Sequence, residues 1–374
     1  MNRYNRLEVL SFFLLAALVF SFGAFVERPL AAAMTAAEAR RLLDEGLDHF
    51  YNLEYDRAIA NFERLREDDP GSAKWHNHVA MAYFYKELLQ GGAFEGDLFD
   101  ASNKFFKTKK FPVDSFLDSR FHRSNQKAIE ICEQALKTQP EDRDALYSCG
   151  VGYAARAAHQ GLIERSALNF LGNARRANNY HSRLVRAHPR HYDGYLIPGL
   201  YDFVLGSLPG PVKFLFFFAG LTGDKQRGMH LVENVSVWGN GAKHDAQILL
   251  TVIYRREKRF ADARRTLEQL AVAFPRNYIF PLEIASLYRA ADELPKAIRA
   301  YEQVLEKSHA GTPNFSEASA ARIHFELGVL YQRTEDMEAA HRHFEQVAAS
   351  RGSTPDLNAE SAANLERLRA APSP

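Results

Sequence analysis

Residues 327–347 read LGVLYQRTEDMEAAHRHFEQV, and this stretch decides the fold. Gly328 is followed three positions later by Tyr331, and Ala340 is followed four positions later by Phe344. Small residues let two helices approach closely, and large side chains can then fill the notch between them. The spacing therefore predicts a helical hairpin that is packed through these four residues.

The same spacing occurs near the beginning of the chain, at Gly46, Ala58, Phe62 and Pro70. A small residue, then an alanine twelve positions on, then an aromatic residue four positions further on resembles the tetratricopeptide repeat. Each such repeat has a first helix (helix A) and a second helix (helix B). The resemblance implies an all-α fold, a right-handed α-solenoid of about seven helix pairs with a C-terminal capping helix.

The repeat can be followed along most of the chain. We expect repeats over 35–72, 73–142, 143–191, 192–243, 244–277, 278–311 and 321–354, and a capping helix over 356–370. The residues expected to pack helix A against helix B in these repeats are Gly46, Ala58, Phe62, Ala80, Tyr83, Ala128, Gly150, Tyr153, Gly199, Tyr254, Ala263, Tyr288, Ala297, Tyr301, Gly328, Tyr331, Ala340 and Phe344.

The second, third and fourth of these repeats are longer than the others. Their helix A and helix B small residues lie 48, 27 and 29 positions apart instead of twelve, in the pairs Ala80 and Ala128, Gly150 and Ala177, and Gly199 and Gly228. The extra residues, among them insertions over 91–122 and 205–224, all fall between helix A and helix B. They therefore emerge on one face of the solenoid. His181 and Val232 stand where a phenylalanine is usual.

The insertion at 205–224 is strongly apolar. Residues 205–231 read LGSLPGPVKFLFFFAGLTGDKQRGMHL, with phenylalanines on several faces of a short expected helix that is either buried or inserted in lipid. The Leu-Pro start, the apolar helix and the following Gly-x-x-Gly-Asp-Lys-x-x-Gly-x-x-x-Leu resemble the tetratricopeptide-repeat 39 family, which includes the inclusion-body clearance protein of yeast. The resemblance covers roughly Leu168 to Val235. It implies a helical-repeat protein that works near membranes or lipid bodies and has no known catalytic residues.

The N-terminus predicts export. Arg3 and Arg6 precede a run over residues 9–26 without charged residues, and Ala31, Ala32 and Ala33 fit a small-x-small cleavage site. Residues 1–33 are thus either a cleaved signal peptide or a retained N-terminal membrane anchor, because the run is just long enough to span a membrane. Both alternatives place the repeats outside the cytoplasm, in the periplasm or cell envelope.

The composition excludes one class of partner. The 47 basic and 46 acidic residues are well mixed and give a net charge of +1, so no basic stripe for nucleic acid is expected. The chain has two cysteines, Cys132 and Cys149, on neighbouring expected helices. They could pair in an oxidising compartment, although we expect two small buried apolar residues instead.

We expect no catalytic, cofactor-binding or metal-binding residues, and therefore no enzyme. The chain has 14 histidines, but the pairs His76 with His78 and His341 with His343 are two positions apart. Such residues point to opposite sides of a helix and cannot share one metal ion. We find no nucleophile in a recognisable setting and no phosphate-binding glycine loop.

The chain does contain two candidate binding surfaces. Large apolar side chains are expected along the concave face of the first four repeats, at Leu43, Leu47, Phe50, Tyr51, Met81, Phe84, Tyr85, Tyr147, Leu196, Leu200 and Phe203. Either the insertions fold back and fill this groove or it binds an apolar ligand. We favour the filled groove. A candidate basic surface for a partner protein follows in the last three repeats, at Arg255, Arg256, Arg289, Arg322 and Arg333.

These features predict a non-catalytic scaffold or adaptor for protein–protein interaction, exported to the cell envelope, that binds partner proteins through the solenoid surface. The membrane is a further partner if the N-terminal segment is not cleaved. The alternative function is a carrier or sensor of an apolar ligand such as a lipid, which would use the aromatic groove of the first four repeats.

Overall fold

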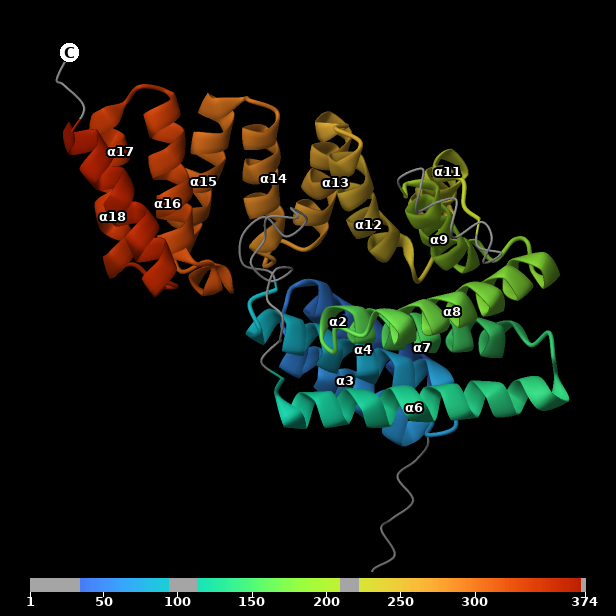
Figure 1. Ribbon diagram of the computed structural model, residues 1–374. Helices are drawn as coiled ribbons and strands as arrows, with labels where there is room; N and C mark the ends of the chain where they lie inside the picture. Colours follow the sequence, from blue (N-terminus) through green and yellow to red (C-terminus); the bar gives the residue numbers. More distant parts are fainter. Residues whose placement is uncertain (1–33, 94–112, 209–221, 371–374) are drawn as a thin grey trace, which may run out of the picture. The chain divides into compact units, whose positions relative to one another are not determined.

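The computed structural model describes residues 34–93, 113–208 and 222–370, and the regular structure within these ranges is helical (Figure 1). It divides into residues 1–40 and residues 41–374. Of the first unit, residues 34–40 are described, where Thr35 and Glu38 cap the beginning of a helix. The Thr35 amide donates to Glu38 at 2.9 Å, and the Glu38 amide donates to the Thr35 hydroxyl at 3.2 Å. This reciprocal pairing satisfies helix donors that have no partner within the helix.

The described helices of the chain form seven pairs, followed by one further helix. The pairs are α2 (Ala36–Tyr51) with α3 (Tyr55–Asp68), α4 (Ala73–Gln90) with α6 (Ser115–Thr138), α7 (Arg143–Leu162) with α8 (Ala167–Ala187), α9 (Leu196–Gly206) with α11 (Lys225–Trp238), α12 (Lys243–Arg256) with α13 (Phe260–Ala273), α14 (Ile279–Ala290) with α15 (Leu294–His309), and α16 (Ala320–Arg333) with α17 (Met337–Ala349). The last helix is α18 (Pro355–Ala370), and two short 3-10 helices lie at Tyr192–Tyr195 and Phe315–Glu317. The predicted all-α solenoid is confirmed.

Glycine residues set the distance between the helices of a pair. A methyl group added at Gly46 would lie 2.5 Å from Cε1 of Phe62, and one added at Gly328 would lie 2.7 Å from Cε1 of Phe344. Both phenylalanines are 1 % exposed. The two helices therefore approach closely because the aromatic ring occupies the space that a larger residue would need.

In the third and fourth repeats, other side chains occupy this notch. A methyl group at Gly150 would lie 1.8 Å from the ring of His181, and one at Gly199 would lie 3.0 Å from Val232. The His181 ring is 1 % exposed, and its Nε2 donates a 3.1 Å hydrogen bond to the Tyr147 carbonyl. Burial lowers the pKa of His181 to about 4, so this histidine is neutral at physiological pH and packs as an aromatic side chain.

A tyrosine on helix A ties several repeats to the helix B before it. Tyr83, Tyr153, Tyr254 and Tyr331 each donate a hydrogen bond of 2.6–3.2 Å to a glutamate on the preceding helix B, namely Glu63, Glu133, Glu233 and Glu302. In the sixth repeat, the Arg264 guanidinium lies over the Tyr288 ring at 4.5 Å instead. The same ring thus both fills space and fixes the neighbouring repeat.

The insertions lengthen the helices where the structure describes them. The helices α7 and α8 have 20 and 21 residues, whereas the regular α12 and α13 have 14 each. The helix α6 has 24 residues and begins at Ser115, far before the packing residue Ala128. Residues 94–112 and 209–221, which include the expected apolar helix, lie outside the described residues, as do residues 1–33.

Figure 1 shows α14 to α18 side by side, and each of these helices contacts the next one. The last, α18, also contacts α16 and buries Leu357 and Ser361, whereas most of its other side chains are at least partly exposed. It is the predicted capping helix, which covers the apolar side of the last repeat. Within the described ranges, no helix combines the length and the apolar character that crossing a membrane requires.

Candidate functional site

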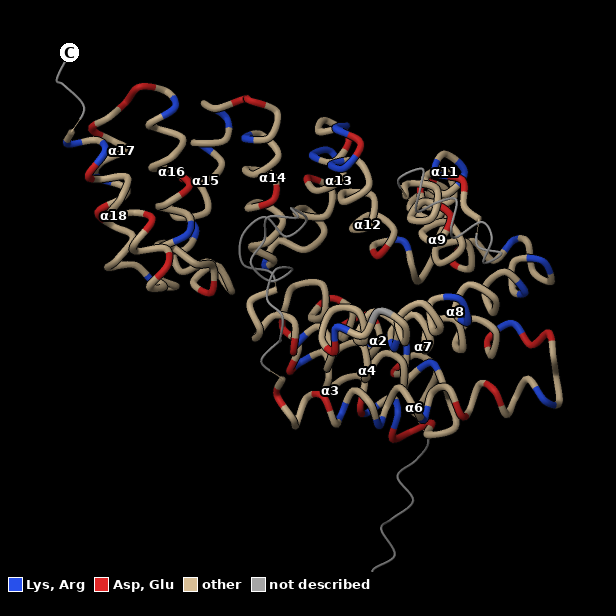
Figure 2. The backbone as a smooth tube through the Cα atoms, in the orientation of Figure 1, with Lys and Arg blue, Asp and Glu red and all other residues tan. Residues whose placement is uncertain are grey.

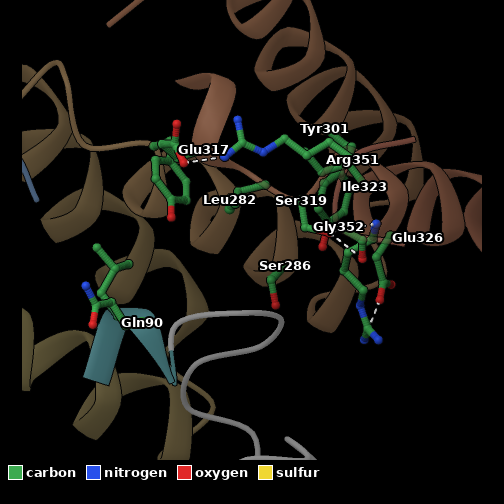
Figure 3. Close-up of a pocket in the computed structure, with 13 residues that line it drawn as sticks. Gln90, Leu282, Ser286, Tyr301, Glu317, Ser319, Ile323, Glu326, Arg351 and Gly352 are labelled. Atoms are coloured by element: carbon green, nitrogen blue, oxygen red, sulfur yellow. Dashed lines mark hydrogen bonds and ion pairs between the residues drawn. The ribbon is translucent and has the colours of Figure 1, made fainter. Parts of the chain in front are cut away.

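A cavity of about 350 Å³ lies against the helix A side of the last two repeats (Figure 3). Leu282 and Ser286 line it from α14, and Ile323 and Glu326 line it from α16. Helix A positions recur on one side of a solenoid because the repeats stack in parallel. The remaining lining residues are Leu89, Gln90, Tyr278, Tyr301, Glu317, Ser319, Arg322, Arg351 and Gly352.

Charged groups of both signs line this cavity. Arg322 pairs with Glu326 at 2.8 Å, and Arg289 pairs with the same carboxylate at 2.7 Å. At the rim, Arg351 pairs with Glu317, as Figure 3 shows. The Nε atom of Arg322 is buried, and it makes no hydrogen bond within the described residues. A buried donor of this kind is satisfied only when an acceptor such as a carbonyl or carboxylate oxygen comes within hydrogen-bond distance.

The residues of the predicted apolar groove lie inside the protein. Tyr51, Phe84 and Phe203 are buried, and Leu43, Leu47, Phe50, Met81, Tyr85, Tyr147, Leu196 and Leu200 are partly buried. Phe84 packs against Phe121 of α6, with ring centroids 5.7 Å apart. Phe121 belongs to the predicted insertion over 91–122, so this part of the insertion packs against Phe84.

The fifth repeat covers much of the rest of the predicted apolar groove. Tyr51 and Phe203 belong to one buried cluster with residues of α12 and α13, among them Leu250 and Leu267, and Leu47, Phe50 and Leu196 pack against that cluster. We expected the insertions to fill the groove. A later repeat takes part as well, a contact between distant residues that a periodic pattern does not contain.

The arginines of the predicted basic surface are mostly neutralised. Arg255 pairs with Glu283 at 3.1 Å, and Arg333 pairs with Asp292 at 2.6 Å. Arg289 and Arg322 share Glu326 as described, and Arg256 and Arg333 are the exposed members of the set. Figure 2 shows basic and acidic residues interspersed along these helices. Ion pairs with a neighbouring repeat therefore account for Arg255, Arg289 and Arg333, and an ion pair within α16 accounts for Arg322.

The paired histidines of the sequence have separate surroundings. His76 lies 3.1 Å from the Pro70 carbonyl, and the His78 ring stacks on Phe62 at 5.0 Å. His341 pairs with Glu345 at 3.4 Å, and His343 lies 2.9 Å from His324. Neither pair shares a ligand position, as their spacing predicts.

One group of His and carboxylate side chains does converge within metal-binding distance among the described residues, and it was missed. It consists of Asp118, His122 and His159. Asp118 and His122 are four positions apart on α6, a spacing that places two side chains on one face of a helix. That spacing was the available signal. The third member comes from α7, and the sequence gives no indication of its proximity.

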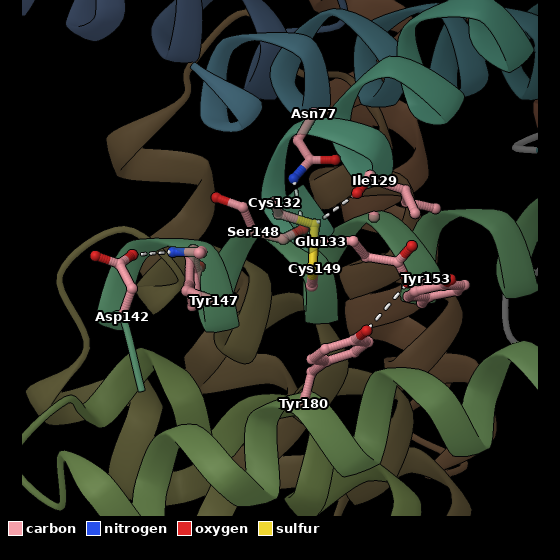
Figure 4. Close-up of a disulfide and its surroundings, with 12 residues drawn as sticks. Asn77, Ile129, Cys132, Glu133, Asp142, Tyr147, Ser148, Cys149, Tyr153 and Tyr180 are labelled. Atoms are coloured by element: carbon pink, nitrogen blue, oxygen red, sulfur yellow. Dashed lines mark hydrogen bonds between the residues drawn. A yellow bond between two sulfur atoms is a disulfide. The ribbon is translucent and has the colours of Figure 1, made fainter. Parts of the chain in front are cut away.

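The two cysteines form a disulfide between α6 and α7 (Figure 4). The Cα atoms of Cys132 and Cys149 lie 5.6 Å apart, within the usual range for a disulfide. The preferred expectation of two separate buried thiols is therefore wrong. Nearby, the hydroxyl groups of Tyr153 and Tyr180 both donate to Glu133, at 2.7 and 3.1 Å. The Glu133 carboxylate thus links α6 to α7 and α8.

The fold and its repeat packing agree with a comparison to known families. The family model described as "Tetratricopeptide repeat" matches residues 43–95, 250–313 and 282–355. This chain contains tetratricopeptide repeats. The matched ranges contain the first repeat and the last three, which are the regular ones. The elongated third and fourth repeats, over 143–243, lie outside them.

Solved structures of other tetratricopeptide-repeat proteins are similar in part. A tetratricopeptide-repeat protein of Parabacteroides merdae is 13 % identical, with 88 % of this chain and 98 % of that chain covered and a TM-score of 0.32. A thermophilic one of Thermus thermophilus is 14 % identical, with 67 % and 98 % covered and a TM-score of 0.36. No curated protein matches the chain. The narrower resemblance of Leu168 to Val235 to the tetratricopeptide-repeat 39 family stays a prediction.

Proposed function

We propose that this tetratricopeptide-repeat protein is a non-catalytic scaffold or adaptor of the cell envelope, and that it holds an extended polar segment of a partner protein in the cavity beside α14 and α16. Tetratricopeptide repeats in general mediate protein–protein interaction. The observation that carries the proposal for this cavity is the buried Nε–H of Arg322, which makes no hydrogen bond within the described residues.

The chemistry of the lining matches a peptide better than a lipid. Ser286, Glu326 and Arg322 offer donors and acceptors within one cavity, while Leu282 and Ile323 offer apolar contact. A polypeptide backbone presents carbonyl oxygens and amide groups at short intervals and can satisfy such a mixed surface. We do not propose the apolar-ligand carrier, because the aromatic residues expected to form its groove are packed within the protein.

Export is part of the same proposal. Its support is the charge-free run over 9–26 behind Arg3 and Arg6, together with the disulfide between Cys132 and Cys149. Structural disulfides persist in oxidising compartments and are rare in reducing ones. An alkaline phosphatase fused to the C-terminus of the full chain is expected to be active in cells, because this enzyme needs its own disulfides. An inactive fusion would contradict export, and N-terminal sequencing of the mature protein would then show whether residues 1–33 are removed.

Site-specific photo-crosslinking in the native cell tests the binding site. We expect a photoreactive amino acid at Leu282, which lines the cavity and is partly exposed, to capture a partner protein. The same amino acid at Val272, which is 83 % exposed on α13 and outside the cavity lining, is the control.

The variant Arg322→Gln is expected to reduce capture at Leu282 at least several-fold. Glu326 keeps its pairing with Arg289 in this variant, so the fold is retained and the melting temperature changes little. Equal capture from Leu282 and Val272, or capture unchanged by Arg322→Gln, would contradict a partner site at this cavity.

A further inference from the structure

A cluster of two imidazoles and three carboxylates lies where α4, α6 and α7 meet. Asp118 and His122 belong to α6, His159 to the last turns of α7, Glu87 to α4, and Glu164 to the turn after α7. The three helices contact one another. We propose that this cluster binds one divalent transition-metal ion of the zinc type.

The distances between the side chains fit a shared ion. His159 Nε2 lies 3.2 Å from Asp118 Oδ1 and 3.5 Å from Glu87 Oε2, and His122 Nε2 lies 3.3 Å from the same Asp118 oxygen. Zinc bonds of about 2.0–2.1 Å in tetrahedral geometry separate the ligand atoms by about 3.3 Å. One ligand atom each from Asp118, His122 and His159 lies within 4.8 Å of the other two.

The buried members of the cluster lack hydrogen bonds. His159 is 0 % exposed and Glu87 is 1 % exposed, yet neither ring nitrogen of the histidine and neither oxygen of the glutamate has a hydrogen-bond partner within the described residues. These atoms lie at ion-pair distance from one another without being aligned for hydrogen bonds, an arrangement that a shared metal ion would satisfy. An isolated ion pair held by a proton would align the N–H with an oxygen.

The surroundings of His159 resemble those of a metal ligand. Its ring stacks on Phe121, with centroids 4.3 Å apart and planes inclined by 10°, which fixes the orientation of the imidazole. Its second nitrogen, Nδ1, lies 3.3 Å from Oε1 of Glu164. These two atoms are within ion-pair distance but are not aligned for a hydrogen bond, so Glu164 is placed where the carboxylate partner of a ligating histidine usually lies.

A turn holds Glu164 in this place. The amides of Ile163 and Glu164 both donate to the His159 carbonyl, at 2.8 and 3.2 Å, and Arg165 follows with a left-handed φ of 57°. This conformation ends α7 and turns the chain back over its last residues. His122, with 45 % of its side chain exposed, provides access for an ion from solvent.

The position of the site gives it a structural purpose. Asp118 and His122 lie on the part of α6 that precedes Ala128, and His159 lies near the end of the lengthened α7. These are the parts that the insertions add to the repeat. A metal ion there would fix the added turns of two repeats to each other and to α4, because binding free energy stabilises the state in which the ligands are assembled.

Zinc binding to the full-length chain tests the proposal. The protein is purified in detergent without a polyhistidine tag, stripped with EDTA, and exchanged into Zn²⁺-containing buffer. We expect mass spectrometry of the metal content to give one Zn²⁺ per chain after gel filtration, and the melting temperature to rise with Zn²⁺ concentration. Less than about a tenth of an equivalent of zinc, or a melting temperature that zinc leaves unchanged, would overturn the proposal in favour of a cluster held by protons alone.

Variants localise the ion. His122→Gln is expected to lose the bound zinc ion. Because the His122 side chain is 45 % exposed, the substitution is expected to leave the fold intact. Glu164→Gln is expected to weaken zinc binding by about 10–100-fold, as for other residues that orient a ligand. His230→Gln, with 72 % of the side chain exposed on α11, is the matched control and keeps one zinc. Full zinc binding by His122→Gln would also overturn the proposal, since it would place any bound ion elsewhere.

Discussion

The hydroxyl group of Tyr51 donates a 2.9 Å hydrogen bond to Oδ1 of Asp245, 194 residues further along the chain. The Tyr51 ring also packs against Phe274, with centroids 4.8 Å apart. Two residues after Phe274, the Arg276 guanidinium donates to Glu54 at 2.9 Å and to Asp48 at 2.6 Å. The first repeat is therefore attached to the fifth, in addition to its neighbour in the stack. Nearest-neighbour packing alone would not provide this link.

Asp245 predicts that stability falls as the pH rises. Burial raises the pKa of Asp245 from 3.8 to about 6, although the hydrogen bond from Tyr51 lowers it in part. The pKa of Asp245 is higher in the folded protein than in the unfolded chain. The contribution of Asp245 to the stability of the fold is therefore complete below pH 3.8 and is lost as the pH rises through 6. The amide oxygen of Asp245→Asn still accepts the hydrogen bond from Tyr51. The melting temperature of this variant is expected to exceed that of the wild type by a margin that grows from pH 4 to pH 7.

Melting curves across this pH range check the prediction for Asp245. Asp56→Asn, with 82 % of its side chain exposed, reports the effect of removing a surface carboxylate. A difference between Asp245→Asn and the wild type that stays constant from pH 4 to pH 7 would show that Asp245 is not desolvated in the folded protein.

Glu54 has the opposite dependence. Burial acts to raise its pKa, but hydrogen bonds from Arg276, His49 and Asn314 outweigh burial and lower the pKa from 4.5 to about 2. Its contribution to stability is therefore present above pH 4.5 and is lost as the pH falls towards 2. The advantage of the wild type over Glu54→Gln in melting temperature is expected to shrink between pH 5 and pH 3.

The link between Glu54 and Arg276 can be measured directly. A double-mutant cycle of Glu54→Gln and Arg276→Gln at pH 7 is expected to give a coupling free energy of about 1–2 kcal/mol, because the pair is hydrogen-bonded but partly solvated. Urea unfolding of the four proteins supplies the values. Additive effects of the two changes would mean that the first and fifth repeats are not joined by this pair.

The disulfide is expected to stabilise the folded state by about 3 kcal/mol, because Cys132 and Cys149 are separated by 17 residues and closing such a loop restricts the unfolded chain. Urea unfolding with and without reductant measures the difference. The double variant Cys132→Ala and Cys149→Ala is the control and is expected to be insensitive to reductant. Thiol counting under denaturing conditions should find none before reduction, and two reactive thiols at that stage would contradict the pairing.

Gly150 tests the notch that His181 fills. A methyl group there would lie 1.8 Å from the buried ring, so Gly150→Ala is expected to lower the free energy of unfolding by about 1–3 kcal/mol through overpacking. Gly172→Ala on α8, where no atom lies within 4 Å, is the matched helical control and is expected to raise stability by up to about 1 kcal/mol. Equal effects of the two changes would show that the notch is looser than described.

Much of the fold is predictable because its repeats are local. Gly328, Tyr331, Ala340 and Phe344 lie within one hairpin, and their spacing alone requires two helices in close contact. The same logic places His181 and Val232 opposite Gly150 and Gly199, although neither is the usual residue. The glutamates that accept from the helix A tyrosines were not predicted, although three of them precede their tyrosine by 20 or 21 residues.

The sites were less predictable because they depend on contacts between repeats. The expected basic surface ignored Glu283 and Glu326, which reach the arginines from the next repeat. The His pairs were judged by spacing along one helix, whereas the cluster at His159 draws on three helices and a turn. Spacing within a helix indicates which residues share a face, but not what the neighbouring helix presents to it.

The sequence by itself determined a helical-repeat chain and the places where its repeats are interrupted, because both depend on the order of residues within a short stretch. Only the tertiary structure decided that Cys132 pairs with Cys149, that Tyr51 reaches Asp245, and that Asp118, His122 and His159 converge. These contacts depend on how the lengthened helices of different repeats are packed, which is set by the whole buried surface rather than by any local pattern.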